Sequence, residues 1–253
     1  MKRPRTDDVR GRDGHFVPTK DRNIWFDGGT VVLVADNIAF RLHKGLLSEF
    51  SAYFGRLFDE PQPAAPTEGF DGAQVVRLTD KAEDIARLLR LAIHGSKRLQ
   101  ASERVDFPLV ASWIRMGHKY ERQDICAKAM ERLVSFFSDN LKEWLVAHAS
   151  YGTPLISVMP EEAVGAVNLA RLTGTLTILP SALYMCCQLS SKDLLRGVTL
   201  SDGTIEKLNE GDVERCFDAR EEVMRQNINS MLRLWQPDTA RACSTPTFCK
   251  HAL

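Results

Sequence analysis

The sequence predicts an α+β protein in which a small sheet capped by helices comes first and an all-helical region follows. Short β-branched or alternating apolar runs, typical of strands, occupy residues 31–42 and 74–78. From residue 46 onward, apolar residues recur mostly at spacings of three and four, which is the helical pattern. Proline and glycine stand where helices would start and stop in the second half.

The chain divides into three predicted parts. Residues 1–22 hold seven Lys or Arg and four Asp and almost nothing apolar. Such a segment buries too little apolar surface to fold, so we expect a disordered basic tail. Its residues 2–5 could also belong to a nuclear-import patch, although a solvated terminus is the simpler interpretation. A first domain is predicted at 23–140 and a helical extension at 141–253.

Three strands are predicted in the first domain. The ordered chain is expected to begin at Ile24-Trp25-Phe26. Val31–Val34 is β-branched and precedes Asp36-Asn37, whose side chains tolerate the positive φ of a two-residue turn. Residues 38–42 are then the return strand, and the apolar run at 74–78 is the third strand.

Two short helices and a loop are predicted between the second and third strands. Leu46, Phe50, Tyr53 and Leu57 share one helical face, and Ser51 suits a break with a new helix cap. Residues 59–73 contain three prolines and two glycines, so no regular element is expected there.

The remaining helices are predicted from their capping residues. Asp80 followed by Glu83 resembles a capping box for a helix that ends at Gly95. Further helices are expected to start at Asp106, Asp124, Pro160, Pro180 and Asp212, with stops at Gly174 and Gly197. The helix from Asp212 is predicted to be the longest.

Composition excludes several classes of protein. The 253 residues carry 33 Lys or Arg against 33 Asp or Glu, so no excess of positive charge supports nucleic-acid binding. No apolar run approaches the roughly 20 residues that span a bilayer, and residues 1–22 lack the apolar stretch of a secretory signal. We therefore expect an intracellular protein, cytoplasmic or nuclear, without direct nucleic-acid or membrane partners.

No pattern of catalytic or metal-binding residues was found. The nucleophile-elbow, phosphate-loop, dinucleotide-loop and His-Glu-x-x-His motifs are absent. The six cysteines form no Cys-x-x-Cys pair and are expected to be reduced. Cys243, Cys249 and His251 are the only metal-like group, and they lack zinc-site spacing and a fourth ligand. We expect no enzyme and no catalytic, cofactor or metal site.

One constellation resembles a known family. Phe40-x-x-His43-Lys44 follows the predicted hairpin, two apolar residues precede a serine, and Ser51-Ala52-Tyr53-Phe54 and Phe58 come next. This order resembles the opening of a BTB/POZ domain, and the later predicted strand and helices follow in the family's order. The Pro-rich loop and residues 169–174 are similar to the fungal branch, whose helical extension the second half resembles.

The resemblance implies a BTB/POZ fold, a three-stranded sheet capped by helices, that acts through protein contacts. We expect a non-enzymatic protein–protein interaction module that self-associates as a homodimer. Its most concrete form is a client adaptor that joins a cullin scaffold in an E3 ubiquitin ligase. The alternative is a scaffold or indirect transcriptional regulator with no ligase role.

The resemblance also implies candidate partner-binding residues. Ile24, Trp25 and Phe26 precede the first strand, where dimeric members exchange a segment; alternatively, they pack under the helical extension. Phe58 and Glu60 match a hydrophobic-x-Glu motif of cullin-binding members, although Phe58 is also the family's core phenylalanine. A ligase role predicts an exposed Phe58, and a scaffold role predicts a buried one with Glu60 in solvent.

One position departs from the family's pattern. Thr30 stands where many animal members have an aspartate that pairs with the basic residue after the histidine, here Lys44. Since a buried lysine without a partner is costly, we expect Lys44 to reach solvent or another acid.

Overall fold

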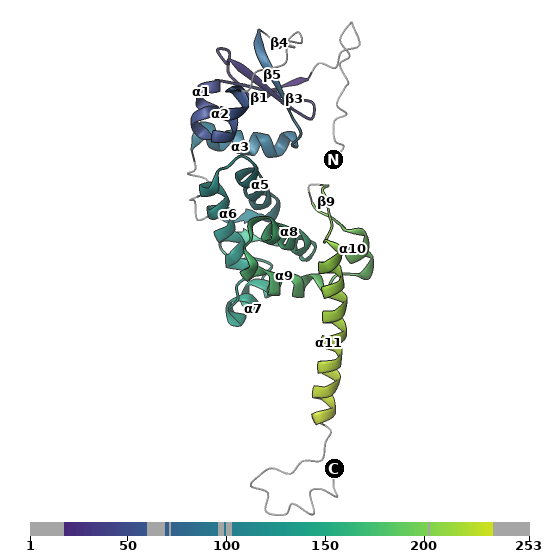
Figure 1. Ribbon diagram of the computed structural model, residues 1–253. Coiled ribbons are helices and arrows are strands. Elements are labelled where there is room, and N and C mark those ends of the chain that lie inside the picture. Colours follow the sequence, from purple (N-terminus) through teal and green to yellow (C-terminus); the bar gives the residue numbers. More distant parts are fainter. Residues whose placement is uncertain are drawn as a thin grey trace, which may run out of the picture.

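The computed structural model describes residues 18–59, 69–70, 72–95, 99, 103–201 and 203–234. The sheet and its helices lie at one end of the molecule, and helix α11 (Glu210–Leu234) projects from the other end (Figure 1). Further helices lie between them. This mixed architecture confirms the predicted α+β class.

The sheet has five strands, not the three predicted. β2 (Val31–Ala35) and β3 (Ile38–Leu42) form the expected hairpin, and β5 (Ala73–Leu78) runs parallel to β2. β1 (Thr19–Trp25) pairs with β3, and β4 (Gly69–Phe70) pairs with β5. The order is β1-β3-β2-β5-β4, so the two unpredicted strands are the edges.

Both edge strands correct sequence predictions. β1 begins at Thr19, inside the predicted tail 1–22, whose residues 1–17 lie outside the described residues. β4 lies within the predicted loop 59–73, most of which also lies outside them. Ile24 is the only buried residue of β1, so this strand shows no apolar alternation.

Both faces of the central strand are covered. Val31, Leu33 and Ala35 belong to the main hydrophobic cluster, whereas Val32 and Val34 join a smaller cluster on the other face. Burial on two faces explains why β2 reads as a continuous apolar run.

The helices of the first half follow the predicted order. α1 (Lys44–Phe50) and α2 (Ala52–Asp59) are separated at Ser51, whose backbone is extended and whose hydroxyl donates to the Tyr120 carbonyl at 2.7 Å. α3 (Ala82–His94), α5 (Phe107–Lys119) and α6 (Gln123–Phe136) come next.

Two predicted helix caps were wrong. Lys81, not Asp80, is the N-cap of α3, because Asp80 accepts hydrogen bonds from Lys119 and from the Tyr120 hydroxyl, each at 2.7 Å. Arg122, not Asp124, is the N-cap of α6, and the two residues are ion-paired at 2.7 Å. Asp106 is the N-cap of α5 as predicted, but its side chain makes no capping hydrogen bond.

The second half is mostly helical but not all-helical as predicted, because it contains one strand pair of its own and one strand that pairs with residues 105–106 of the first half. The predicted helix from Pro180 to Gly197 is two helices, because α9 (Leu179–Cys186) ends before Ser190, which caps α10 (Ser191–Arg196). Gly174 ends α8 in the left-handed conformation, as predicted. The elements are α7 (Leu141–Ala149), η1 (Pro160–Glu162), α8 (Ala163–Thr173), η2 (Leu176–Ile178), α9 (Leu179–Cys186) and α10 (Ser191–Arg196), with the pairs β6 (Val105–Asp106) with β7 (Ile156–Ser157) and β8 (Val198–Thr199) with β9 (Ile205–Glu206).

One core crosses the boundary predicted at residue 140. The main hydrophobic cluster contains buried residues from Ile24 to Cys216 without a division between the two predicted parts. Asn140 caps α7 by accepting from the backbone amides of Lys142 and Glu143, so this position marks a helix start.

Candidate interaction surfaces

The segment Ile24-Trp25-Phe26 is part of the chain's own sheet. Ile24 is 1% exposed and belongs to the main core, so its predicted role in an interface is not supported. Trp25 packs on the second face of the sheet, where its ring meets Phe70 edge-on at 5.7 Å between centroids. Phe26 alone is exposed, with its ring 6.4 Å from that of His43. The elements that β1 contacts include β3 and α3, both in the first half of the chain.

Lys44 has neutral partners in place of the charged pair of many family members. The Thr30 hydroxyl accepts from the backbone amide of Lys44 at 3.0 Å, so it satisfies a free donor at the start of α1. The Lys44 ammonium donates to the Gln74 amide oxygen and lies 5.7 Å from the centre of the Phe58 ring. Lys44 was expected to reach solvent or an acid. It is half-buried, and its ammonium binds an amide, not an acid.

Phe58 lies at the edge of the core. It is half-buried, and its ring stacks on the fully buried ring of Phe54 with centroids 6.0 Å apart. Asp59, the last residue of α2, is exposed, and Glu60 lies outside the described residues. Phe58 is therefore partly exposed. The ligase role predicted an exposed Phe58 and the scaffold role a buried one, so its burial does not decide between them.

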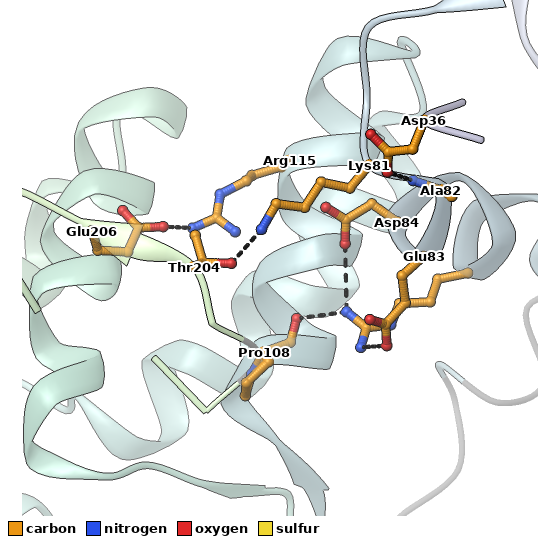
Figure 2. A network of polar contacts seen from close by, with 10 residues as sticks. Asp36, Lys81, Ala82, Glu83, Asp84, Pro108, Arg115, Thr204 and Glu206 are labelled. Atoms are coloured by element: carbon orange, nitrogen blue, oxygen red, sulfur yellow. Dashed lines mark hydrogen bonds and ion pairs between the residues drawn. The ribbon is translucent and has the colours of Figure 1, made fainter. Parts of the chain in front are cut away.

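Polar contacts join the sheet end of the molecule to the second half (Figure 2). The ammonium of Lys81, at the start of α3, donates to the Thr204 hydroxyl beside β9, and Arg115 of α5 is ion-paired with Glu206 of β9. At the other end of the network, the Ala82 amide donates to Asp36 of the β2–β3 turn at 2.8 Å. The β8–β9 hairpin is thus fastened to helices of the first half.

An apolar groove opens between α7 and α9. Its volume is about 500 Å3, and it is lined by Leu141, Trp144, Leu145, Pro180 and Tyr184, among others. Leu141 and Leu145, one turn apart, are 66% and 51% exposed. The Trp144 indole nitrogen is buried and has no hydrogen-bond partner in the part of the chain that is described. Adjacent exposed apolar groups of this kind are typical of protein-binding surfaces.

A second apolar surface runs along α11. Val213 and Phe217 pack against the main core, and Met224, Ile228, Met231 and Leu232 continue the same helical face beyond it. Each of these last four side chains is more than half exposed, and this part of the helix projects away from the body (Figure 1).

The base of α11 is fixed by a buried carboxylate. Asp212 is fully buried and accepts from Arg171 at 2.7 Å and from Asn209 at 2.6 Å. Burial alone would raise the pKa of Asp212, but the hydrogen bonds from Arg171 and Asn209 outweigh it and lower the pKa below its ordinary value. Arg220 donates to the carbonyl of Cys187 at 2.7 Å, which holds the next turns against α9.

The two apolar surfaces differ in how far the sequence indicated them. Ile228, Met231 and Leu232 fit the predicted apolar recurrence of the longest helix, although that pattern alone did not distinguish a buried face from an exposed one. The α7–α9 groove was missed. Its available signal was the pair Leu141 and Leu145 together with Val146, which gives α7 apolar residues around most of its circumference.

The described residues provide neither a metal-binding cluster nor a membrane-spanning helix. They contain no group of three or more His, Cys, Asp or Glu side chains placed to hold a metal ion. Cys243, Cys249 and His251 lie outside them. Among the described helices, none combines the length and apolar character needed to cross a membrane.

No protein-family model matches the chain, and no curated protein matches it.

Proposed function

We propose that this protein is a non-enzymatic protein–protein interaction module of the BTB/POZ type that self-associates and presents a client through its helical second half. The observation that carries the proposal is the order of elements in the first half. A β2–β3 hairpin is followed by two short helices broken at Ser51, a strand parallel to β2, and helices α3, α5 and α6. This is the order implied by the Phe40, His43 and Lys44 constellation.

The exposed apolar surfaces support a binding role. The α7–α9 groove can receive a helix or an extended segment with apolar side chains, while the exposed half of α11 offers an apolar face of its own. Their burial in a complex would remove several large apolar side chains from water, which drives association.

The most concrete form of the proposal is a client adaptor for a cullin-type E3 ubiquitin ligase. Phe58 is half-buried, so only part of its ring can contribute to a cullin contact, and Asp59 beside it is exposed. On this proposal Glu60 adds the charged contact, and the α7–α9 groove holds the client.

Co-purification of the full chain with the N-terminal domain of a BTB-binding cullin tests this form. We expect a complex with micromolar or tighter affinity that Glu60→Lys weakens at least tenfold. Glu214→Lys makes the same charge change at an exposed position on α11 and should leave binding unchanged. Equal binding by both variants, or no complex at all, would remove the ligase role.

Light scattering on the full chain tests self-association separately. A dimer has twice the chain mass of 28.4 kDa. A dimer that does not bind a cullin would favour the alternative, a scaffold or indirect transcriptional regulator. A monomer at all concentrations would contradict self-association itself.

A further inference from the structure

Three thiols gather where α9 ends against α11. Cys186 is the last residue of α9, Cys187 is its C-cap, and Cys216 lies on the facing side of α11. Cys186 and Cys216 are fully buried, whereas Cys187 is half-buried. All three are free thiols, and none of them lines the α7–α9 groove.

Cys187 and Cys216 are in direct contact. The Cys187 thiol donates to the Cys216 backbone carbonyl, with 3.5 Å between sulfur and oxygen. The pKa of Cys216 is raised to about 12. The largest cause is burial, and the smaller ones are the negative charge of an ionised Cys187 and the hydrogen bond with Cys187. Two charged groups face this pair: Arg220 favours the thiolate of Cys216, and Asp212 opposes it.

We propose that Cys187 and Cys216 form an oxidation site, in which a peroxide converts the two thiols into a disulfide that joins the end of α9 to α11. Cys187 reacts first, because it is the only one of the three residues that is not fully buried.

The chemistry takes two steps. The Cys187 sulfur attacks one peroxide oxygen and the O–O bond breaks. Cys187 becomes a sulfenic acid, and one water is released. The Cys216 sulfur then attacks the Cys187 sulfur, the S–O bond breaks, and a second water leaves. The two thiols lose two electrons and the peroxide gains them, and both thiol protons end in the waters.

The disulfide would close a loop that contains α10 and the β8–β9 hairpin. Arg220 already holds the Cys187 carbonyl, so the crosslink would reinforce an existing contact. A crosslink that fits the folded state restricts the unfolded chain, so oxidation should stabilise the base of α11.

Peptide mapping of the full chain tests the site. The reduced protein is treated with hydrogen peroxide, free thiols are alkylated, and tryptic peptides are identified by mass spectrometry. We expect the peptide 216–220 to be linked to the peptide 172–192, which contains both Cys186 and Cys187. The link should disappear on reduction and in Cys187→Ala, and it should persist in Cys186→Ala, the adjacent control.

Thermal unfolding gives an independent measurement. Oxidised wild type should melt at least a few degrees above the reduced protein, and Cys187→Ala should show no such shift. The proposal is overturned if the link runs through Cys186, if it joins two chains, or if Cys187 is oxidised to sulfinic acid without forming a link.

Discussion

Arg132 shows how one buried side chain can hold several segments together. It is 3% exposed, and its guanidinium donates to the carbonyls of Glu103, Leu155 and Leu99 at 2.9, 2.8 and 3.2 Å. Burial lowers its pKa, yet an arginine remains charged at neutral pH. These contacts tie α6 to the segments that precede β6 and β7.

We expect Arg132→Lys to lower the free energy of unfolding by about 2–4 kcal/mol. A lysine keeps the charge but cannot reach three carbonyls with one planar group, so buried acceptors lose their donors. Urea unfolding measures the loss. Arg196→Lys, at an exposed position in α10, is the matched control and should change stability by less than about 0.5 kcal/mol. Equal effects of the two variants would contradict the structural role of Arg132.

Asp212 gives a prediction about pH. Its folded-state pKa lies below the ordinary value of 3.8, so its contribution to stability is present above that value and is lost as the pH falls through the lowered pKa. We expect Asp212→Asn to lower the free energy of unfolding by about 3 kcal/mol at neutral pH. The difference in melting temperature between wild type and variant should shrink below about pH 4. A difference that stays constant down to pH 3 would show that the carboxylate charge does not stabilise the fold.

At the scale of the element, strand β1 gives a prediction about folding stability. Ile24→Ala removes a fully buried side chain and should cost about 2–5 kcal/mol, whereas Phe26→Ala, at an exposed position, should cost less than about 1 kcal/mol. Because β1 pairs with β3 of the same chain, Ile24→Ala should leave the oligomeric state measured by light scattering unchanged. A shift of the Ile24→Ala variant toward the monomer would instead indicate that β1 is exchanged between two chains.

Elements with strong local signals were predictable, and elements defined by distant partners were not. The Asp36-Asn37 turn, the break at Ser51 and the stop at Gly174 follow from local conformational preferences. Asp80 has equally good capping chemistry, but Lys119 and Tyr120 bind it from another helix.

The same contrast applies to the candidate surfaces. The apolar spacing of α11 is visible in the sequence, but its exposure depends on where the body of the molecule ends. The α7–α9 groove exists because α7 packs on the body through Trp144 and Ala147, which leaves Leu141 and Leu145 uncovered. The local sequence of α7 does not show which face of the helix packs on the body.

At the scale of the whole molecule, the parts predicted as 23–140 and 141–253 share one hydrophobic core. They are also joined by the contacts of Lys81 with Thr204 and of Arg115 with Glu206. Glu206 additionally accepts from Asn168 of α8 at 2.7 Å, so one carboxylate connects β9 to two helices. Segments that share a core in this way are expected to unfold together.

We therefore predict a single cooperative unfolding transition for the full chain. Tryptophan fluorescence and far-UV circular dichroism should give coincident urea curves, since Trp113 lies in the first part and Trp144 in the second. Glu206→Ala should shift both curves together to lower urea and lower the free energy of unfolding by about 1–3 kcal/mol, because it removes the acceptor of Arg115 and one of the two acceptors of Asn168. Two separate transitions, with only the later part affected by Glu206→Ala, would mean that the two parts fold independently and that the shared core contributes little to their coupling.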